Sequence, residues 1–264
     1  MIKNGPLHLA VLHDDLAAIR LLKNNPDLLL RKNAQGLTPL ELGLLLGKQK
    51  AVSILSPCIY PPIMIQKKGE EDIGYYNRDE FEKFFGIKYL QTPFFHSYEL
   101  LQAMQNACPW MLLHTVVGNE HRSLGALLHK PLFSGALAPV AIRWIDDEIG
   151  YGLFSQNLIA KETFIGQYTG QVHRSGRFCK KKLNGYCMRI PTRFWSLQYF
   201  VMDAQNAGNE LRFANHSDTP NIRPFCLIDR GLVHIGFFAL RQIEVGEELT
   251  FDYGRAYWKY RKKK

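Results

Sequence analysis

The sequence predicts an α+β protein with more than one domain, in which α-helical repeats and a helical linker precede a β-rich domain. Two observations lead to this prediction. Near the N-terminus, apolar residues recur at helical spacing in two units, and the second unit repeats the first after 33 positions, Pro39 matching Pro6. From Val140 onward, short β-type runs alternate with glycine-containing polar turns, and no long helical pattern separates them. A parallel doubly wound sheet is therefore not expected.

The composition limits the class of protein. With 46% hydrophobic and 22% charged residues, the 264-residue chain has enough apolar side chains for a folded core. No stretch approaches the roughly 20 apolar residues that a membrane span needs, so we expect no membrane partner. The first residues turn acidic after a few apolar positions and do not form a signal peptide, although export by another route stays open.

Net charge and cysteine content bear on partners and compartment. The formal charge of +9 fits a negatively charged partner such as nucleic acid, and it equally fits good solubility alone. The five cysteines are odd in number, and none lies in a C-x-x-C pair. This pattern indicates a reducing intracellular compartment, and it argues against a disulfide framework and against a zinc cluster.

The N-terminal repeat is expected to span residues 1–57. Residues 6–10 (PLHLA) and 39–43 (PLELG) each open a helical pattern, and a second helical pattern follows each of them. Thr38 can cap the next helix, and Pro39 suits its first position. The period and the T-P-L start resemble the ankyrin repeat. Since two units bury little surface unaided, the pair is either a docking surface for a protein or a structural extension that leans on the following segment.

Residues 58–137 are expected to form a helical linker without catalytic residues. A proline-rich stretch ends the repeat pattern. Helical patterns follow at residues 77–85, 97–107 and 120–129, and Pro131 then breaks the pattern. The histidines of this segment do not share the spacing of metal ligands.

The domain at residues 138–258 contains two polar runs that are too specific for solvated loops. Residues 208–221 read GNELRFANHSDTPN, and residues 246–254 read GEELTFDYG. Polar residues beside buried strands are where binding and catalytic groups concentrate. We expect strands around them at residues 140–144, 163–168, 186–190, 199–202, 222–228, 232–240 and 249–251. The two runs are therefore candidates for one shared site.

Two further runs, EIGYGLFS and FIGQYTG, precede these motifs in a fixed order. In order, spacing and residue identity, residues 138–258 resemble the SET-domain protein-lysine methyltransferases, and within them the small chlamydial-type bacterial SET proteins. The resemblance implies a SET fold whose N-H-S and D-Y segments pass through one another as a pseudoknot. It also implies S-adenosyl-L-methionine as cofactor and a histone or histone-like basic protein as substrate. A secreted bacterial effector that reaches a host nucleus is the corresponding expectation for localisation.

The resemblance also assigns roles to individual residues. Tyr253 and Tyr168 are expected at the reaction centre as catalytic residues. Phe251 joins both in the substrate-lysine channel, where phenylalanine leaves room for di- and trimethylation. The implied cofactor-binding residues are Gly150, Tyr151, Gly152, Arg212, Asn215, His216, Tyr253 and Trp258. A structural role is the alternative for Arg212, and core packing is the alternative for Trp258 and both tyrosines.

The sequence departs from the family at the end of the domain. Asp218 stands where the family commonly has cysteine, and no C-x-C run follows Tyr253. Many members use those cysteines for a zinc cluster that closes the channel, so no metal is expected here. Either Tyr257 and Trp258 or a partner chain must then close the channel, and the second alternative makes a homodimer an expectation.

Two basic runs and two function hypotheses complete the prediction. The basic tail at residues 259–264 and a cluster at residues 174–182 indicate association with chromatin or nucleic acid, or no more than a solvated surface. The first hypothesis is a protein-lysine methyltransferase, favoured because the motif positions retain the expected side chains. The alternative is an ankyrin-type protein-binding module with an inactive SET domain. A nucleic-acid binder that uses the basic tail is a third reading.

Overall fold

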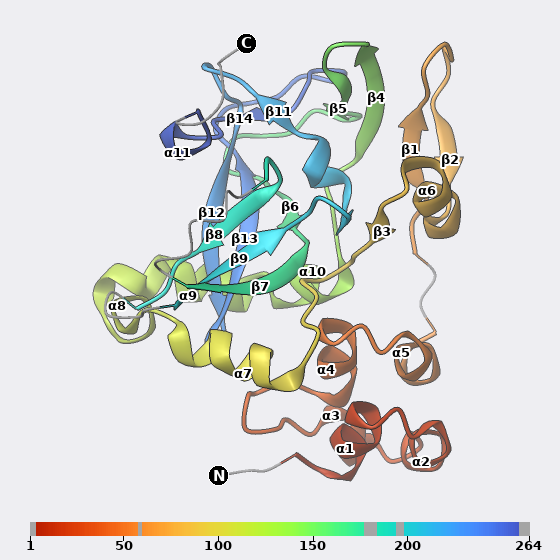
Figure 1. Ribbon diagram of the computed structural model, residues 1–264, viewed down its shortest axis with the longest axis vertical. Coiled ribbons are helices and arrows are strands. Elements are labelled where there is room, and N and C mark those ends of the chain that lie inside the picture. Colours follow the sequence, from red (N-terminus) through yellow and green to blue (C-terminus); the bar gives the residue numbers. More distant parts are fainter. Residues whose placement is uncertain (1–3, 58–59, 177–183, 194–197, 259–264) are drawn as a thin grey trace.

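The computed structural model describes residues 4–57, 60–176, 184–193 and 198–258, and Figure 1 shows their arrangement. A helical N-terminal part lies at one end of the long axis and a β-rich part at the other, as the α+β class predicts. The basic tail, and residues 177–182 of the second basic cluster, lie outside the described residues. Within the described ranges, no helix has the length and apolar character to cross a membrane.

The N-terminal part consists of five short helices. They are α1 (Pro6–Leu12), α2 (Leu16–Leu22), α3 (Pro26–Leu30), α4 (Pro39–Leu45) and α5 (Gln49–Leu55). The bounds of α4 and α5 repeat those of α1 and α2 at an offset of 33 residues. The Thr38 hydroxyl caps α4 by accepting the Glu41 N–H, and the Glu41 carboxylate accepts the Thr38 N–H in return. The sequence repeat is therefore also a repeat of helix pairs.

The middle segment contains helices and strands. Its helices are α6 (Arg78–Phe85), α7 (Tyr98–Ala107), α8 (Trp110–His114), the 3-10 helix η1 (Val116–Gly118), α9 (Asn119–Leu127) and α10 (His129–Ser134). Its strands are β1 (Ile63–Gln66), β2 (Gly74–Tyr76) and β3 (Lys88–Tyr89). β1 pairs antiparallel with β2 and in parallel with β4 of the next domain. The segment expected as a helical linker thus also contains strands, which the sequence did not indicate because such short strands show too little alternation to be recognised.

The sequence predicts that Pro131 breaks a helical pattern, but in the structure Pro131 lies within a helix. It is the third residue of α10, after the N-cap Leu128. The first N–H groups of a helix have no acceptor within the helix, so the missing N–H of proline costs little there.

The C-terminal part is built from short strands. They are β4 (Val140–Asp146), β5 (Gly150–Ser155), β6 (Phe164–Tyr168), β7 (Gln171–Gly176), β8 (Cys187–Ile190), β9 (Gln198–Asp203), β10 (Ala207–Gly208), β11 (Asn215–His216), β12 (Ile222–Asp229), β13 (Leu232–Ala239) and β14 (Thr250–Phe251). The 3-10 helix η2 (Glu210–Phe213) and α11 (Arg255–Trp258) complete it. The larger sheets have the strand orders β2-β1-β4-β5, β12-β13-β6 and β7-β9-β8. Two further two-stranded sheets are formed by β10 with β3 and by β11 with β14.

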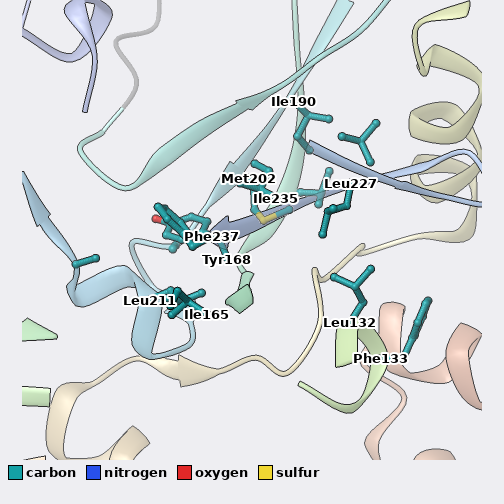
Figure 2. Packing of buried hydrophobic residues seen from close by; sticks show 14 of the residues in the cluster. Leu132, Phe133, Ile165, Tyr168, Ile190, Met202, Leu211, Leu227, Ile235 and Phe237 are labelled. Atoms are coloured by element: carbon teal, nitrogen blue, oxygen red, sulfur yellow. The ribbon is translucent and has the colours of Figure 1, made fainter. Parts of the chain in front are cut away.

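The hydrophobic core lies around the central strand β13. Every residue of β13 is buried, because β12 and β6 flank it in the sheet and α9 packs against β12. Figure 2 shows Tyr168, Met202, Ile235 and Phe237 packed together in this core, with Leu132 and Phe133 of α10 nearby. Since Tyr168 is also a candidate site residue, the core and the site share one wall.

A cluster of ionisable side chains joins the repeat helices to this sheet, and we call it the repeat–sheet joint. It consists of Glu41 on α4, His129 on α10, and Asp229 and Arg230 at the β12–β13 turn. Arg230 Nη1 lies 2.7 Å from Glu41 Oε2, and the two ring nitrogens of His129 lie 2.8 and 2.9 Å from carboxylate oxygens of Glu41 and Asp229. Leu42 of α4 also belongs to the main core. The repeat pair therefore leans on the β-rich part.

Candidate active site

The pairing of β11 with β14 brings the two polar runs side by side. Asn215 lies opposite Thr250 and His216 opposite Phe251, in parallel register. The buried side chain of Asn221 fixes this arrangement, because its Nδ2 donates to the Glu248 carbonyl at 2.7 Å and its Oδ1 accepts the Thr250 N–H at 2.8 Å. The two motifs thus lie side by side, as one shared site would require.

Tyr253 follows β14 and lies at the centre of an aromatic cluster. Its hydroxyl donates to the Ala214 carbonyl at 3.1 Å, and its ring centroid lies 4.8 Å from that of Phe251 and 4.6 Å from that of Tyr257. Burial raises the pKa of Tyr253 well above its ordinary value, with Tyr257 as a further cause. Its phenol is therefore neutral at physiological pH and has an oxygen lone pair left to accept a hydrogen bond.

Tyr168 reaches the same region from the end of β6. Only 3% of it is exposed, and its hydroxyl donates to the Tyr186 carbonyl at 2.8 Å. Burial also raises the pKa of Tyr168, so this phenol is neutral as well. The rings of Tyr168 and Phe251 both contact Phe237 of β13. The three predicted channel residues therefore share one aromatic wall.

His216 has its two ring nitrogens in different environments. Nδ1 accepts the Tyr253 N–H at 3.2 Å, which assigns the remaining proton to Nε2. Nε2 is buried and lies 3.3 Å from the Asp218 carboxylate, but without the alignment of a hydrogen bond. The Trp258 ring packs edge-on against His216 with centroids 4.8 Å apart, and its Nε1 is buried without a partner. This corner of the site therefore holds two unused polar groups beside an aromatic face.

The turn into β5 forms a wall beside Asn215. Gly150 has φ +84°, a conformation that favours glycine. A Cβ atom on Gly152 would lie 2.7 Å from Glu248 Oε1, so only glycine lets β5 approach this carboxylate so closely. Asn215 Nδ2 donates to Glu248 Oε1 at 2.8 Å and to the Tyr151 carbonyl at 3.3 Å. Asn215 thus ties the β5 turn to the end of the second motif.

The Arg212 side chain donates hydrogen bonds to backbone carbonyl groups of the chain. Its Nε donates to the Ala204 carbonyl at 2.9 Å, one Nη donates to the Gln205 carbonyl at 3.3 Å, and its guanidinium lies 4.3 Å from the Tyr186 ring centroid. These contacts support the loop after β9, which is the structural alternative for this residue. A direct role in cofactor binding stays a prediction.

Sequence reasoning did not identify two contributors to the site. Tyr186 had been placed in a strand without a role, and Glu248 had been treated only as part of a motif. Both act through contacts between positions far apart in the chain, Tyr186 with Tyr168 and Glu248 with Asn215, and no local pattern reveals such contacts. Tyr257 had been considered for closing the channel, and it does lie over Tyr253, close to the loop that carries Tyr186.

Metal chemistry has no visible support in the described part of the chain. In residues 4–57, 60–176, 184–193 and 198–258, no group of three or more His, Cys, Asp or Glu side chains is placed to hold a metal ion.

Comparison with known proteins agrees with this geometry. Residues 150–254 match the family model of the SET domain. The chain is 37% identical over 113 residues to histone-lysine N-methyltransferase MEDEA of Arabidopsis thaliana, and 36% identical over 110 residues to histone-lysine N-methyltransferase CLF of the same plant. These matches cover 40% and 41% of this chain but only 16% and 12% of the relatives, so the chain spans a small part of their length.

Among solved structures, a complex of KRYPTONITE with mCHH DNA, an H3(1-15) peptide and SAH is similar at 29% identity. It covers 44% of this chain and 23% of that one, with a TM-score of 0.36. The family match shows that residues 150–254 are similar to a SET domain, and the similar plant proteins are named histone-lysine N-methyltransferases. SET methyltransferases use S-adenosyl-L-methionine as methyl donor.

Proposed function

We propose that the chain is an S-adenosyl-L-methionine-dependent protein-lysine N-methyltransferase that acts on histones or histone-like basic proteins. The observation that carries this proposal is the position of Tyr253. Its hydroxyl is anchored on the Ala214 carbonyl, its N–H is anchored on His216, and its ring stands in the aromatic cluster where the two motifs meet. The names of the similar plant proteins, both histone-lysine N-methyltransferases, support the same activity.

The residues of the site fit the cofactor. His216 Nε2 and Trp258 Nε1 are buried polar atoms without partners, and such atoms are costly unless a ligand pairs with them. The aromatic face of Trp258 suits a purine ring, and the glycine at position 152 allows close approach of the β5 backbone. We assign Asn215, His216, Trp258 and the 150–152 turn to hold it. When bound, the cofactor supplies a sulfonium methyl group.

The aromatic cluster prepares the target amine for reaction. A free lysine amine has a pKa near ~10.4 and is mostly protonated at neutral pH. A narrow channel between Phe251, Tyr253 and Tyr168 excludes water and disfavours the charged ammonium form. The Tyr253 oxygen can accept an N–H of the neutral amine and orient its lone pair. Since both tyrosines stay neutral, they position the amine and do not act as general bases.

The N-terminal helices and the basic runs suggest how substrates are reached. We infer that the helix pairs, which repeat after 33 residues, are ankyrin-like and support a protein partner. The basic tail would favour chromatin, and closure of the channel by a second copy would give a homodimer. A bacterial effector that acts in a host nucleus is consistent with these features and with the chlamydial-type resemblance. The threading of the two motif segments as a pseudoknot is part of the same proposal.

Transfer of labelled methyl groups to a histone mixture tests the proposed activity. We expect the intact chain to methylate histones, and Tyr253→Phe to lower the rate about a hundredfold because the amine loses its orienting acceptor. The ring contacts of Tyr253 remain in this variant, so thermal unfolding should change little. Mass spectrometry of the products then locates the modified lysine.

The second candidate is an inactive SET domain on a protein-binding module. It is favoured only if the intact chain binds the cofactor but transfers no methyl group to any histone. Equal rates for the intact chain and Tyr253→Phe would contradict the role given to the hydroxyl, whatever the substrate.

A further inference from the structure

Glu248 is a half-buried carboxylate beside the cofactor site. None of the ion pairs among the described residues involves it. Its neighbour Glu247, in contrast, lies 2.5 Å from Arg241. Glu248 is held in place because its backbone bridges to Phe154 of β5 and because Asn215 Nδ2 donates to its Oε1 at 2.8 Å. A carboxylate held in place without a protein cation is suited to a cationic ligand.

The same carboxylate fixes the orientation of Asn215. Amide N and O atoms are distinguished by their partners, and both partners of this end of Asn215, Glu248 Oε1 and the Tyr151 carbonyl, can only accept. The nitrogen must therefore face them, and Oδ1 faces away as a further acceptor. Glu248 and Asn215 together give this wall of the site a negative potential.

We propose that Glu248 makes the site prefer the positively charged methyl donor over its uncharged-sulfur product, and that it acts partly by orienting Asn215. The inference rests on the proposed function. Methyl transfer breaks a C–S bond and forms a C–N bond, the bonding pair stays on sulfur, and the amine proton leaves to solvent. The donor therefore carries one positive charge more than the product. An unpaired carboxylate nearby stabilises the donor by this difference, which favours release of the product after each turnover.

Calorimetric titration of the full chain with S-adenosyl-L-methionine and, separately, with S-adenosyl-L-homocysteine tests the preference. Glu248→Gln keeps an acceptor oxygen for Asn215 and removes only the charge. Unit charges about 8 Å apart in a medium of dielectric constant about 20 to 40 interact strongly enough to change affinity about tenfold. We therefore expect donor affinity to fall about tenfold and product affinity to change less than about twofold. Glu248→Ala should weaken both ligands, because it also releases Asn215.

Glu247→Gln is the matched control. It removes the same charge one residue away, but Arg241 already neutralises that charge, so the ratio of the two affinities should stay as in the unmodified chain. Thermal unfolding of each variant checks that it folds. The unmodified chain gives an independent readout, because its preference for the donor should decline with rising salt if it is electrostatic.

The outcomes separate the two proposals. If the unmodified chain binds neither ligand, the proposed function fails and this inference fails with it. If both ligands bind, but Glu248→Gln leaves their affinity ratio unchanged, the inference alone is overturned. Should Glu248→Gln not fold, the salt dependence decides, and a ratio that does not vary with salt would falsify the inference.

Discussion

The repeat–sheet joint and the SET site both connect segments that are far apart in the chain, but they treat their polar groups in opposite ways. At the joint, every charged side chain has a partner. Arg230 contacts Glu41, and His129 lies between Glu41 and Asp229. The Arg230 guanidinium also donates to the Gly36 carbonyl at 2.5 Å. The joint is saturated, so its contacts fix how the repeat helices sit on the sheet.

In the SET site, by contrast, buried or half-buried polar groups lack partners. His216 Nε2 and Trp258 Nε1 are buried without a hydrogen-bond partner, and no cation of the described residues forms an ion pair with Glu248. Each such group lowers the free energy of unfolding by about 1–3 kcal/mol. The contrast distinguishes the joint from this site, but it is no general rule of the molecule, because Gln167, Asn209 and His234 also keep a buried polar atom without a partner.

Removing Arg230 should have the largest effect on the joint. Arg230→Ala leaves the carboxylates of Glu41 and Asp229 buried with one cation fewer, and we expect the free energy of unfolding to fall by about 3 kcal/mol. Chemical denaturation at neutral pH measures it. Arg223→Ala on the same strand is the control, because its contact with Glu162 is exposed and should contribute less than about 0.5 kcal/mol. A similar loss in both variants would contradict a special role of the joint.

The pH dependence of stability, compared between the unmodified chain and Arg230→Ala, tests the coupling of Arg230 to Glu41. Burial acts to raise the pKa of Glu41, but its bonds to Arg230 and to the Thr38 N–H outweigh burial and lower it below its ordinary value. A depressed pKa in the folded state adds stability that is complete above the unfolded-state value of about 4.3 and is lost as the pH falls further. The stability advantage over Arg230→Ala should therefore shrink below about pH 4. An advantage that is constant from neutral to acid pH would show that Glu41 is not coupled to Arg230.

A third prediction concerns a close contact that does not depend on charge. Helix α9 packs so tightly on β12 that a Cβ atom on Gly125 would lie 2.2 Å from the Ile228 carbonyl oxygen. Gly125→Ala should lower the free energy of unfolding by about 2 kcal/mol, since backbone must move to admit the methyl group. Ser123→Ala on the exposed side of the same helix should be nearly neutral. Unchanged stability of Gly125→Ala would mean that α9 can shift freely.

These elements show where sequence reasoning succeeds. The cap of α4 at Thr38 was predicted, because it depends on residues within one helical turn. The order of the SET motifs was equally visible, because each motif is a contiguous run. The family match at residues 150–254 confirms that part of the prediction.

The remaining features depend on contacts that no local pattern contains. The parallel pairing of β1 with β4 joins Met64 to Ala141, and the bond from Asn215 to Glu248 spans 33 positions. The sequence indicated only that His129 lacks the spacing of a metal ligand, and its partners on α4 and β12 could not be named in advance. Which polar groups are paired, and hence where the saturated joint ends and the open site begins, becomes visible only in the folded chain.

The smallest expected effect tests how much space the open site leaves around the target nitrogen. The Phe251 ring lies between Phe237 and Tyr253, with centroids 4.9 and 4.8 Å away, and is 9% exposed. Phe251→Tyr adds a hydroxyl that can hold a water or accept an N–H, so it takes space from a methylated amine. We expect the ratio of dimethyl- and trimethyl-lysine to monomethyl-lysine to fall about fivefold, which corresponds to about 1 kcal/mol. Mass spectrometry of a histone peptide measures the ratio at matched conversion, with the unmodified chain as reference. An unchanged ratio would show that Phe251 does not border the methyl groups, and the channel would then have to be assigned to Tyr168, Tyr253 and Tyr257.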